Sequence, residues 1–155
     1  MEVNCYNENI TEKENIIELI KLAIKKIYDK DKYLIDNRVS ERAIVSKFAL
    51  YFYELSKNKI SDSYDIDVEY NRQGIKTKKL GEEQVCIDFI VHKRGEFNKN
   101  LLAIEFKTYW NKKGKAIERD KEKIKKLCDN SNEYKYKYGF TIIFEKEFNS
   151  INFLF

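Results

Sequence analysis

The stretch QVCIDFIVH (residues 84–92), followed after a short loop by NLLAIEFK (residues 100–107), decides the fold of this chain. Both runs are rich in Ile, Leu and Phe, and the polar segment KRGEFNK (93–99) between them carries Gly95. This pattern predicts two strands joined as a hairpin. Because residues of both parities are apolar, we expect both faces of these strands to be covered. The chain is therefore predicted to build an α/β fold around a buried sheet.

Charged residues interrupt these apolar runs at Asp88, Glu105 and Lys107. Since side chains alternate across a strand, Glu105 and Lys107 point to the same face, and Asp88 shares its face with Cys86 and Ile90. A buried carboxylate is strongly unfavourable unless a cation, a metal ion or hydrogen bonds compensate it. If adjacent strands bring Asp88 and Glu105 together, the two acids repel each other and demand a divalent ion.

A third acid lies on a helix ahead of the hairpin. The segment ERAIVSKFALYFYEL (residues 41–55) has a helical apolar stripe, and Ser40 is suited to cap its N-terminus. At about 100° per residue, Glu41 falls within roughly 60° of the direction of that stripe. Glu41 is therefore predicted to face the core from the first turn. By itself, an acid at this place is explained by the helix dipole.

The rest of the chain completes a single domain, residues 1–155, because no repeat, low-complexity tract or Pro- or Gly-rich linker divides it. Thr11 and Glu14 form a capping box ahead of apolar residues at helical spacing. We expect a central mixed sheet of four to five strands flanked by helices, in the order α-α-β-β-β-α-β. The remaining elements are a helix at about 12–28, a strand at 64–70, a polar segment around 71–83, a helix at about 117–129, and strands at 138–146 and 151–155.

Composition restricts the chemistry available to the chain. Hydrophobic residues make up 43% and charged residues 36%, which is too apolar for disorder and too dispersed for a membrane span. His92 is the only histidine and the three cysteines lack a C-x-x-C pair, which excludes HExxH zinc enzymes, thiolate zinc sites and most serine or cysteine triads. Any catalysis must therefore use carboxylates and lysine. No secretory signal is visible, so we expect a cytoplasmic protein without a membrane partner.

A basic segment follows Lys107. Nine Lys or Arg residues against three acids lie between Lys107 and Lys126, in a chain of net charge +4. Such a segment can contact the phosphates of a nucleic acid, although a lysine-rich helix face is by default merely solvated. Asp120 and Lys123 can pair with each other, and Lys123 or Arg119 can reach toward the carboxylates. The candidate nucleic-acid contacts are Lys112, Lys113, Lys115, Arg119 and Lys123.

Taken together, these residues resemble the motif of the PD-(D/E)XK nuclease superfamily, whose fold is called restriction-endonuclease-like. The matching pattern is Asp88, a gap of sixteen residues, and then Glu105-Phe106-Lys107, with Glu41 on the preceding helix. The chain departs from the motif at Ile87, where the superfamily pattern has proline. The motif is short, and its weight comes from both halves lying on apolar strands joined by a short turn.

The resemblance implies a fold, a cofactor and a reaction. Residues 40–146 resemble the family core of helix, three-strand meander, helix and strand, with the first predicted helix as an addition. In the family, residues at the positions of Glu41, Asp88 and Glu105 hold Mg²⁺ or Mn²⁺. The lysine that matches Lys107 orients or polarises the attacking water and the phosphate. The implied protein is an endo- or exonuclease acting on DNA, or in second place RNA, in a bacterial or phage-infected cell. Many small members of this fold dimerise, so a homodimer is expected by analogy.

Two alternatives stay open. The fold can be retained without catalysis, as a nucleic-acid-binding, protein-binding or regulatory module. The acids can also be structural, in buried ion pairs among Lys107, Glu105 and Asp88. The presence of Glu41 together with these three residues favours the nuclease. A nuclease site should bind a divalent ion through Asp88 and Glu105, whereas an ion-pair cluster should not.

Overall fold

A five-stranded sheet forms the centre of the protein. The computed structural model describes residues 11–57, 59–60, 63–73, 76–148 and 152–154. The strands of the central sheet are β1 (Asp65–Tyr70), β6 (Ile87–His92), β7 (Asn100–Thr108), β8 (Tyr138–Phe144) and β9 (Asn152–Leu154). Their order is β1-β6-β7-β8-β9, and neighbours are antiparallel except β7 and β8, which run parallel. The predicted α/β fold with a mixed sheet is confirmed.

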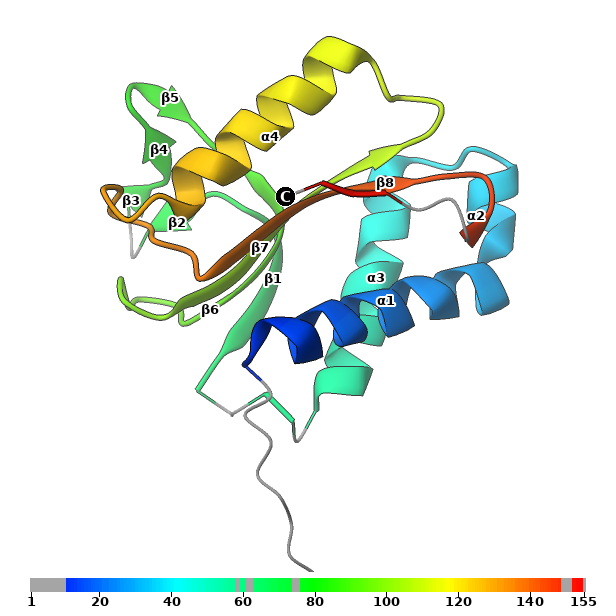
Figure 1. Ribbon diagram of the computed structural model, residues 1–155, viewed down its shortest axis with the longest axis horizontal. Helices are drawn as coiled ribbons and strands as arrows, with labels where there is room; N and C mark the ends of the chain where they lie inside the picture. Colours follow the sequence, from blue (N-terminus) through cyan, green and yellow to red (C-terminus); the bar gives the residue numbers. More distant parts are fainter. Residues whose placement is uncertain (1–10, 58, 61–62, 74–75, 149–151, 155) are drawn as a thin grey trace, which may run out of the picture.

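Helices cover both faces of this sheet (Figure 1). They are α1 (Lys13–Lys30), α2 (Lys32–Asp36), α3 (Glu41–Ser56) and α4 (Gly114–Cys128). α1 and α3 pack against each other and bury their apolar stripes on one face of the sheet, while α4 packs on β7 and β8 from the other face. The sheet is therefore the middle layer of three.

The predicted helices and strands lie close to the observed ones. α1 and α3 match the predicted helices within two residues at each end. Ser40 caps α3, because its Oγ accepts a hydrogen bond from Ala43 N at 3.4 Å. The prediction of a capping box at Thr11 and Glu14 is wrong. Glu12 is the N-cap residue of α1, and its side chain makes no capping hydrogen bond. α4 begins three residues before the predicted helix, and the short α2 was not predicted.

The segment between β1 and β6 was predicted as a polar loop but contains two small hairpins. Lys78, between them, is 2% exposed and donates a hydrogen bond to Tyr136 Oη at 2.8 Å. Its ammonium also lies between 5.0 and 5.6 Å from the ring centroids of Tyr70, Tyr134 and Tyr136. The cation–π contacts with Tyr134 and Tyr136 stabilise the packing of this segment against the residues that precede β8. The hairpins consist of β2 (Arg72–Gln73) with β3 (Lys76–Thr77) and β4 (Lys79–Leu80) with β5 (Glu83–Gln84).

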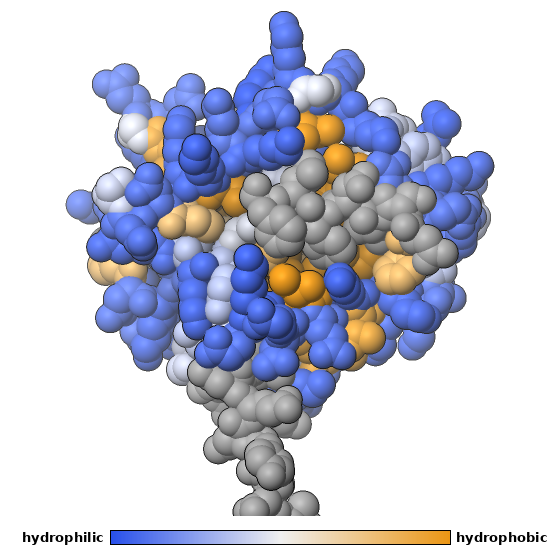
Figure 2. All heavy atoms as spheres, viewed as in Figure 1, coloured by the Kyte–Doolittle hydropathy of each residue, from blue (hydrophilic) through white to orange (hydrophobic). Residues whose placement is uncertain are grey.

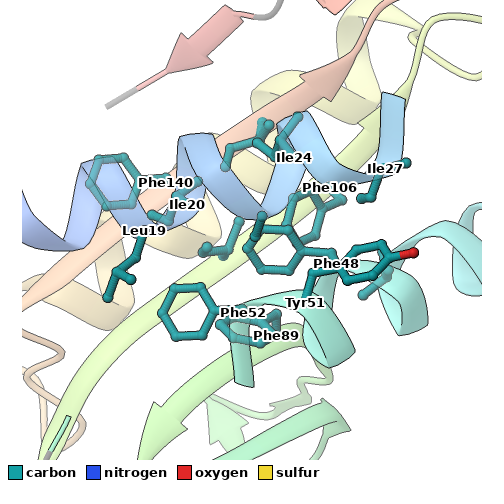
Figure 3. Packing of buried hydrophobic residues seen from close by; sticks show 14 of the residues in the cluster. Leu19, Ile20, Ile24, Ile27, Phe48, Tyr51, Phe52, Phe89, Phe106 and Phe140 are labelled. Carbon is teal, nitrogen blue, oxygen red and sulfur yellow. The ribbon is translucent and has the colours of Figure 1, made fainter. Parts of the chain in front are cut away.

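Aromatic rings fill the core between α1, α3 and the sheet (Figure 3). The ring of Phe48 in α3 lies 4.9 Å from that of Phe89 in β6 and 4.8 Å from that of Phe106 in β7, between centroids. All three side chains are fully buried. Tilted and edge-on ring pairs add to the stabilisation from the area they bury. This packing holds the first half of α3 against the hairpin, so that Glu41 at the start of the helix meets the sheet.

Small residues on the opposite face let α4 approach closely. Gly139 of β8 pairs with Ala103 of β7. A Cβ atom added at Gly139 would lie 2.5 Å from Cys128 Sγ and 2.6 Å from Ile124 Cγ2, so any side chain there would push α4 outward. The close approach sets how far the side chains of α4 reach over β7.

Hydrophilic residues cover most of the face drawn in Figure 2, with hydrophobic areas between them. Tyr33, Tyr53 and Phe97 are more than half exposed, as single apolar side chains commonly are on proteins. Among the described helices, none is both long enough and apolar enough to cross a bilayer.

Candidate active site

The hairpin of β6 and β7 brings two acids together on the face covered by α4. Phe89 pairs with Ile104, so Asp88 and Glu105 occupy the next positions along the two adjacent strands. Asp88 Oδ2 accepts a hydrogen bond from Phe106 N at 2.8 Å. Burial raises the pKa of Asp88, although this hydrogen bond and two nearby lysines oppose the rise. The expected proximity of the two acids is observed.

Glu41 reaches the same region from the first turn of α3. Its Oε2 accepts hydrogen bonds from Thr108 N at 3.0 Å and from Thr108 Oγ1 at 3.4 Å, and its Oε1 lies 3.4 Å from Lys107 Nζ. Burial raises the pKa of Glu41 and the charge of Asp88 adds to the rise, while Lys107 opposes it. The predicted inward direction of Glu41 is confirmed, and its carboxylate contacts Lys107 and Thr108 of β7.

Lys107 forms an ion pair that the sequence did not indicate. Its Nζ lies 3.0 Å from Asp120 Oδ2 of α4, a contact without hydrogen-bond geometry, and it donates a hydrogen bond to Phe106 O at 3.1 Å. Burial lowers the pKa of Lys107, but Asp120 and Glu41 raise it by more, so the net shift is upward. The amine therefore stays protonated between two carboxylates.

Glu105 is the most buried acid of the site, with 2% of its surface exposed. Its Oε2 lies 2.9 Å from Lys123 Nζ, whereas its Oε1 has no hydrogen-bond partner among the described residues. Thr141, which pairs with Glu105 across β7 and β8, also has a buried Oγ1 without such a partner. Burial raises the pKa of Glu105 to about 8, with a further contribution from Asp88 and opposition from Lys123. A buried acid with an orphaned oxygen is poised to accept a proton or a cation.

Acids outnumber lysines in this centre, and the excess negative charge favours a cation. Carboxylate oxygens are the ligands that Mg²⁺ prefers, and one or two suffice because the ion keeps several waters. The residues present, with the orphaned oxygen of Glu105, fit such an ion. Within the described ranges, no three His, Cys, Asp or Glu side chains form a preformed metal site, so the predicted three-ligand set stays a prediction. The centre contains Glu41, Asp88, Glu105, Asp120, Lys107 and Lys123.

A cavity of about 350 Å³ opens beside this centre, between the first turns of α3 and the edge strand β1. Glu41 and Asp88 both line it, so two of the predicted site residues face one open space. Its size lies at the lower end of the range for small-molecule sites. The other lining residues are Arg42, Val45, Ser46, Val68 and Glu69.

The predicted nucleic-acid contacts divide into two groups. Lys113, Lys115 and Arg119 are exposed around the start of α4, as a phosphate-binding surface requires. Lys112 is also exposed, but its amine is paired with Glu145 at 2.8 Å. Lys123 lies in the site beside Glu105 and also donates a hydrogen bond to Cys86 O at 3.2 Å. The prediction that Lys123 reaches the carboxylates is confirmed.

Asp120 is the site residue that sequence reasoning misplaced. A pair with Lys123 on its own helix was expected. Instead, Asp120 pairs with Lys107 of β7, and Lys123 pairs with Glu105 of β7. The spacing could have shown this, because Asp120 precedes Ile124 and Leu127 by four and seven residues and therefore lies on the inward stripe of α4. A carboxylate on such a stripe needs a cation on the facing sheet.

Comparisons with protein-family models, with curated proteins and with solved structures found no match for this chain.

Proposed function

We propose that the chain is a Mg²⁺- or Mn²⁺-dependent nuclease with a restriction-endonuclease-like core of the PD-(D/E)XK type, acting on DNA in preference to RNA. The observation that carries the proposal is the convergence of acids from α3, β6 and β7: Glu41 lies 3.4 Å from the amine of Lys107, and Asp88 lies next to Glu105 on the adjacent strand. Carboxylates and lysine can together supply the charge stabilisation that phosphodiester hydrolysis requires without histidine. The open cavity at Glu41 and Asp88 gives a substrate access to this centre.

Each side chain has a role in the proposed reaction. A divalent ion held by Asp88 and Glu105 would supply neutralisation of phosphate oxygens and activation of water. Lys107, charged and held at 3.4 Å by Glu41, stabilises negative charge that develops on the phosphate. Asp120 holds the same amine from the opposite side at 3.0 Å, which makes it a positioning residue. The exposed Lys113, Lys115 and Arg119 attract the nucleic-acid backbone.

One observation favours a second candidate, a binding module that does not use catalysis. The lysines of the centre are already engaged, Lys107 with Asp120 at 3.0 Å and Lys123 with Glu105 at 2.9 Å. Such ion pairs can serve as structural neutralisation of buried acids without any metal. The two candidates differ in what they offer the buried Glu105 Oε1: a bound metal ion would satisfy this oxygen, whereas a purely structural cluster leaves it unsatisfied.

Cleavage assays separate the two candidates. Supercoiled plasmid, linear duplex, single-stranded DNA and RNA are incubated with the protein in Mg²⁺, in Mn²⁺ and in chelator. We expect metal-dependent cleavage that Lys107→Ala reduces by about 100-fold or more, because a charge-stabilising group is lost. The matched control is Lys30→Ala, an exposed lysine on α1, on the opposite face of the sheet from α4.

Metal binding gives a readout that does not depend on activity. In calorimetric titrations with Mn²⁺, wild-type protein should bind the ion, and Asp88→Asn should bind it at least about tenfold more weakly because a charged ligand is lost. Absence of metal-dependent cleavage on every substrate, together with no ion binding, would reject the nuclease and leave the binding module.

A further inference from the structure

The cavity beside Glu41 and Asp88 has a chemically mixed lining. Both acids contribute to it. Its walls are formed by Val45, which is 4% exposed, and by Val68 of β1, which is 40% exposed. The two acids suit an ion and a phosphate bound to it, and the apolar walls suit an uncharged, flat group attached to that phosphate.

The size of the cavity restricts what can enter it. A volume of about 350 Å³ accommodates one nucleotide together with an ion, whereas a base-paired and stacked duplex presents no single nucleotide to such a space. A nucleotide that lies next to the cleaved phosphate must therefore leave its stack to occupy the cavity. Unpairing is least unfavourable at single strands, frayed ends and mismatches.

Two of the residues that line the cavity form an ion pair. Arg42 of α3 pairs with Glu69 of β1, and the arginine side chain is 75% exposed. Glu69 has a φ of 48°, in the left-handed region that non-glycine residues rarely adopt. Exposed ion pairs are weak, so Arg42 can leave Glu69 and turn to a phosphate or to the face of a base. The lining of the cavity therefore offers a cation to a substrate that enters.

On these grounds we infer that the cavity between α3 and β1 is a subsite for one unpaired nucleotide, so that the preferred substrate is single-stranded or locally unpaired nucleic acid. This inference rests on the proposed nuclease function and names the substrate class of the same site. Val68 and Ser46, which line the cavity from the strand and from the helix, are the specificity-determining positions, and Arg42 is the cationic contact residue.

The test fills the cavity without touching the acids. Val68→Trp adds a large side chain on an exposed position of the edge strand, and Ser46→Trp does so from the helix side if the first variant does not fold. The matched control is Leu50→Trp, an exposed position on α3 outside the cavity, 47% exposed. Binding of a short single-stranded oligonucleotide, a blunt duplex and the same duplex with one mismatch is measured by fluorescence anisotropy in Ca²⁺, and cleavage in Mg²⁺.

We expect wild-type protein to bind and cleave the single strand and the mismatched duplex at least about tenfold better than the blunt duplex, because these substrates need no unpairing. The cavity-filling variant should lose this preference and Leu50→Trp should keep it. The inference is overturned if the cavity-filling variant binds single strands as wild type does, or if wild type prefers the blunt duplex. If wild type cleaves nothing but binds single strands in the same variant-dependent way, the subsite stands and only the proposed hydrolysis fails.

Discussion

Replacing Glu105 by glutamine tests the electrostatics of the site most directly. The change keeps the shape of the side chain and removes its ability to ionise. Burial, followed by the charge of Asp88, raises the pKa of Glu105 to about 8, whereas a glutamate carboxyl ordinarily titrates near 4.5. Between these two pH values the folded protein retains a proton that the unfolded chain has lost. The stability that Glu105 contributes is therefore present below pH 4.5 and lost as the pH rises to 8.

The size of the effect follows from the two pKa values. Each unit of pKa corresponds to about 1.4 kcal/mol, so the full loss across this range is at most about 5 kcal/mol. Glutamine cannot titrate, and Glu105→Gln is free of this loss. The variant should therefore match wild-type stability near pH 4.5 and exceed it increasingly toward pH 8. Lys123, whose amine faces this side chain, keeps its hydrogen bond to Cys86 O in the variant and remains partly exposed.

Urea unfolding followed by circular dichroism measures this difference at several pH values between 4.5 and 8. Glu122→Gln, which changes an exposed glutamate on the same helix as Lys123, is the matched control and should follow the wild-type curve. If wild type and Glu105→Gln lose stability in parallel as the pH rises, Glu105 is not a protonated buried acid and the reasoning is refuted. In wild type, saturating Mn²⁺ should restore stability at the upper end of the range, because the ion binds the ionised site.

Three further changes test the packing and charges that support the site. Gly139→Ala places a Cβ 2.5 Å from Cys128 Sγ and should lower the free energy of urea unfolding by about 1–3 kcal/mol. Gly114→Ala, with open space at its Cβ, should be nearly neutral, and equal effects of the two changes would contradict the close approach of α4. Burial lowers the pKa of Lys78 to about 8 from an ordinary 10.5. As the pH rises from 8 to 10.5, the free energy of unfolding of the wild type should therefore increase by up to about 3 kcal/mol relative to Lys78→Met, and parallel pH curves in urea unfolding would disprove this. Phe48→Ala should lower the free energy of unfolding by about 3–5 kcal/mol, because it removes a fully buried ring. Tyr53→Ala, at an exposed position, should lower it by about 0.5 kcal/mol or less. A small loss at Phe48 would mean that its ring does not hold α3 on the hairpin.

Local patterns determined the elements and the directions of several side chains. The spacing of apolar residues is a property of a few neighbouring positions, and it predicted α1, α3 and the hairpin of β6 and β7 within a few residues. The same periodicity placed Glu105 on the face of the sheet shared with Lys107 and turned Glu41 inward. The acids stood out because a charge on an apolar stripe or strand conflicts with burial.

Only the tertiary structure decided which charges meet. Lys107 pairs with Asp120, and Lys123 with Glu105, across a gap whose width depends on Gly139 under α4. The sequence left open whether Lys123 pairs with Asp120 on its own helix or reaches the carboxylates, because periodicity gives distances only between positions on one element. Likewise, Lys78 among three tyrosines and the cavity between α3 and β1 arise from segments far apart along the chain. Spacing along one element is set by backbone geometry, whereas contacts between elements depend on how all side chains pack at once.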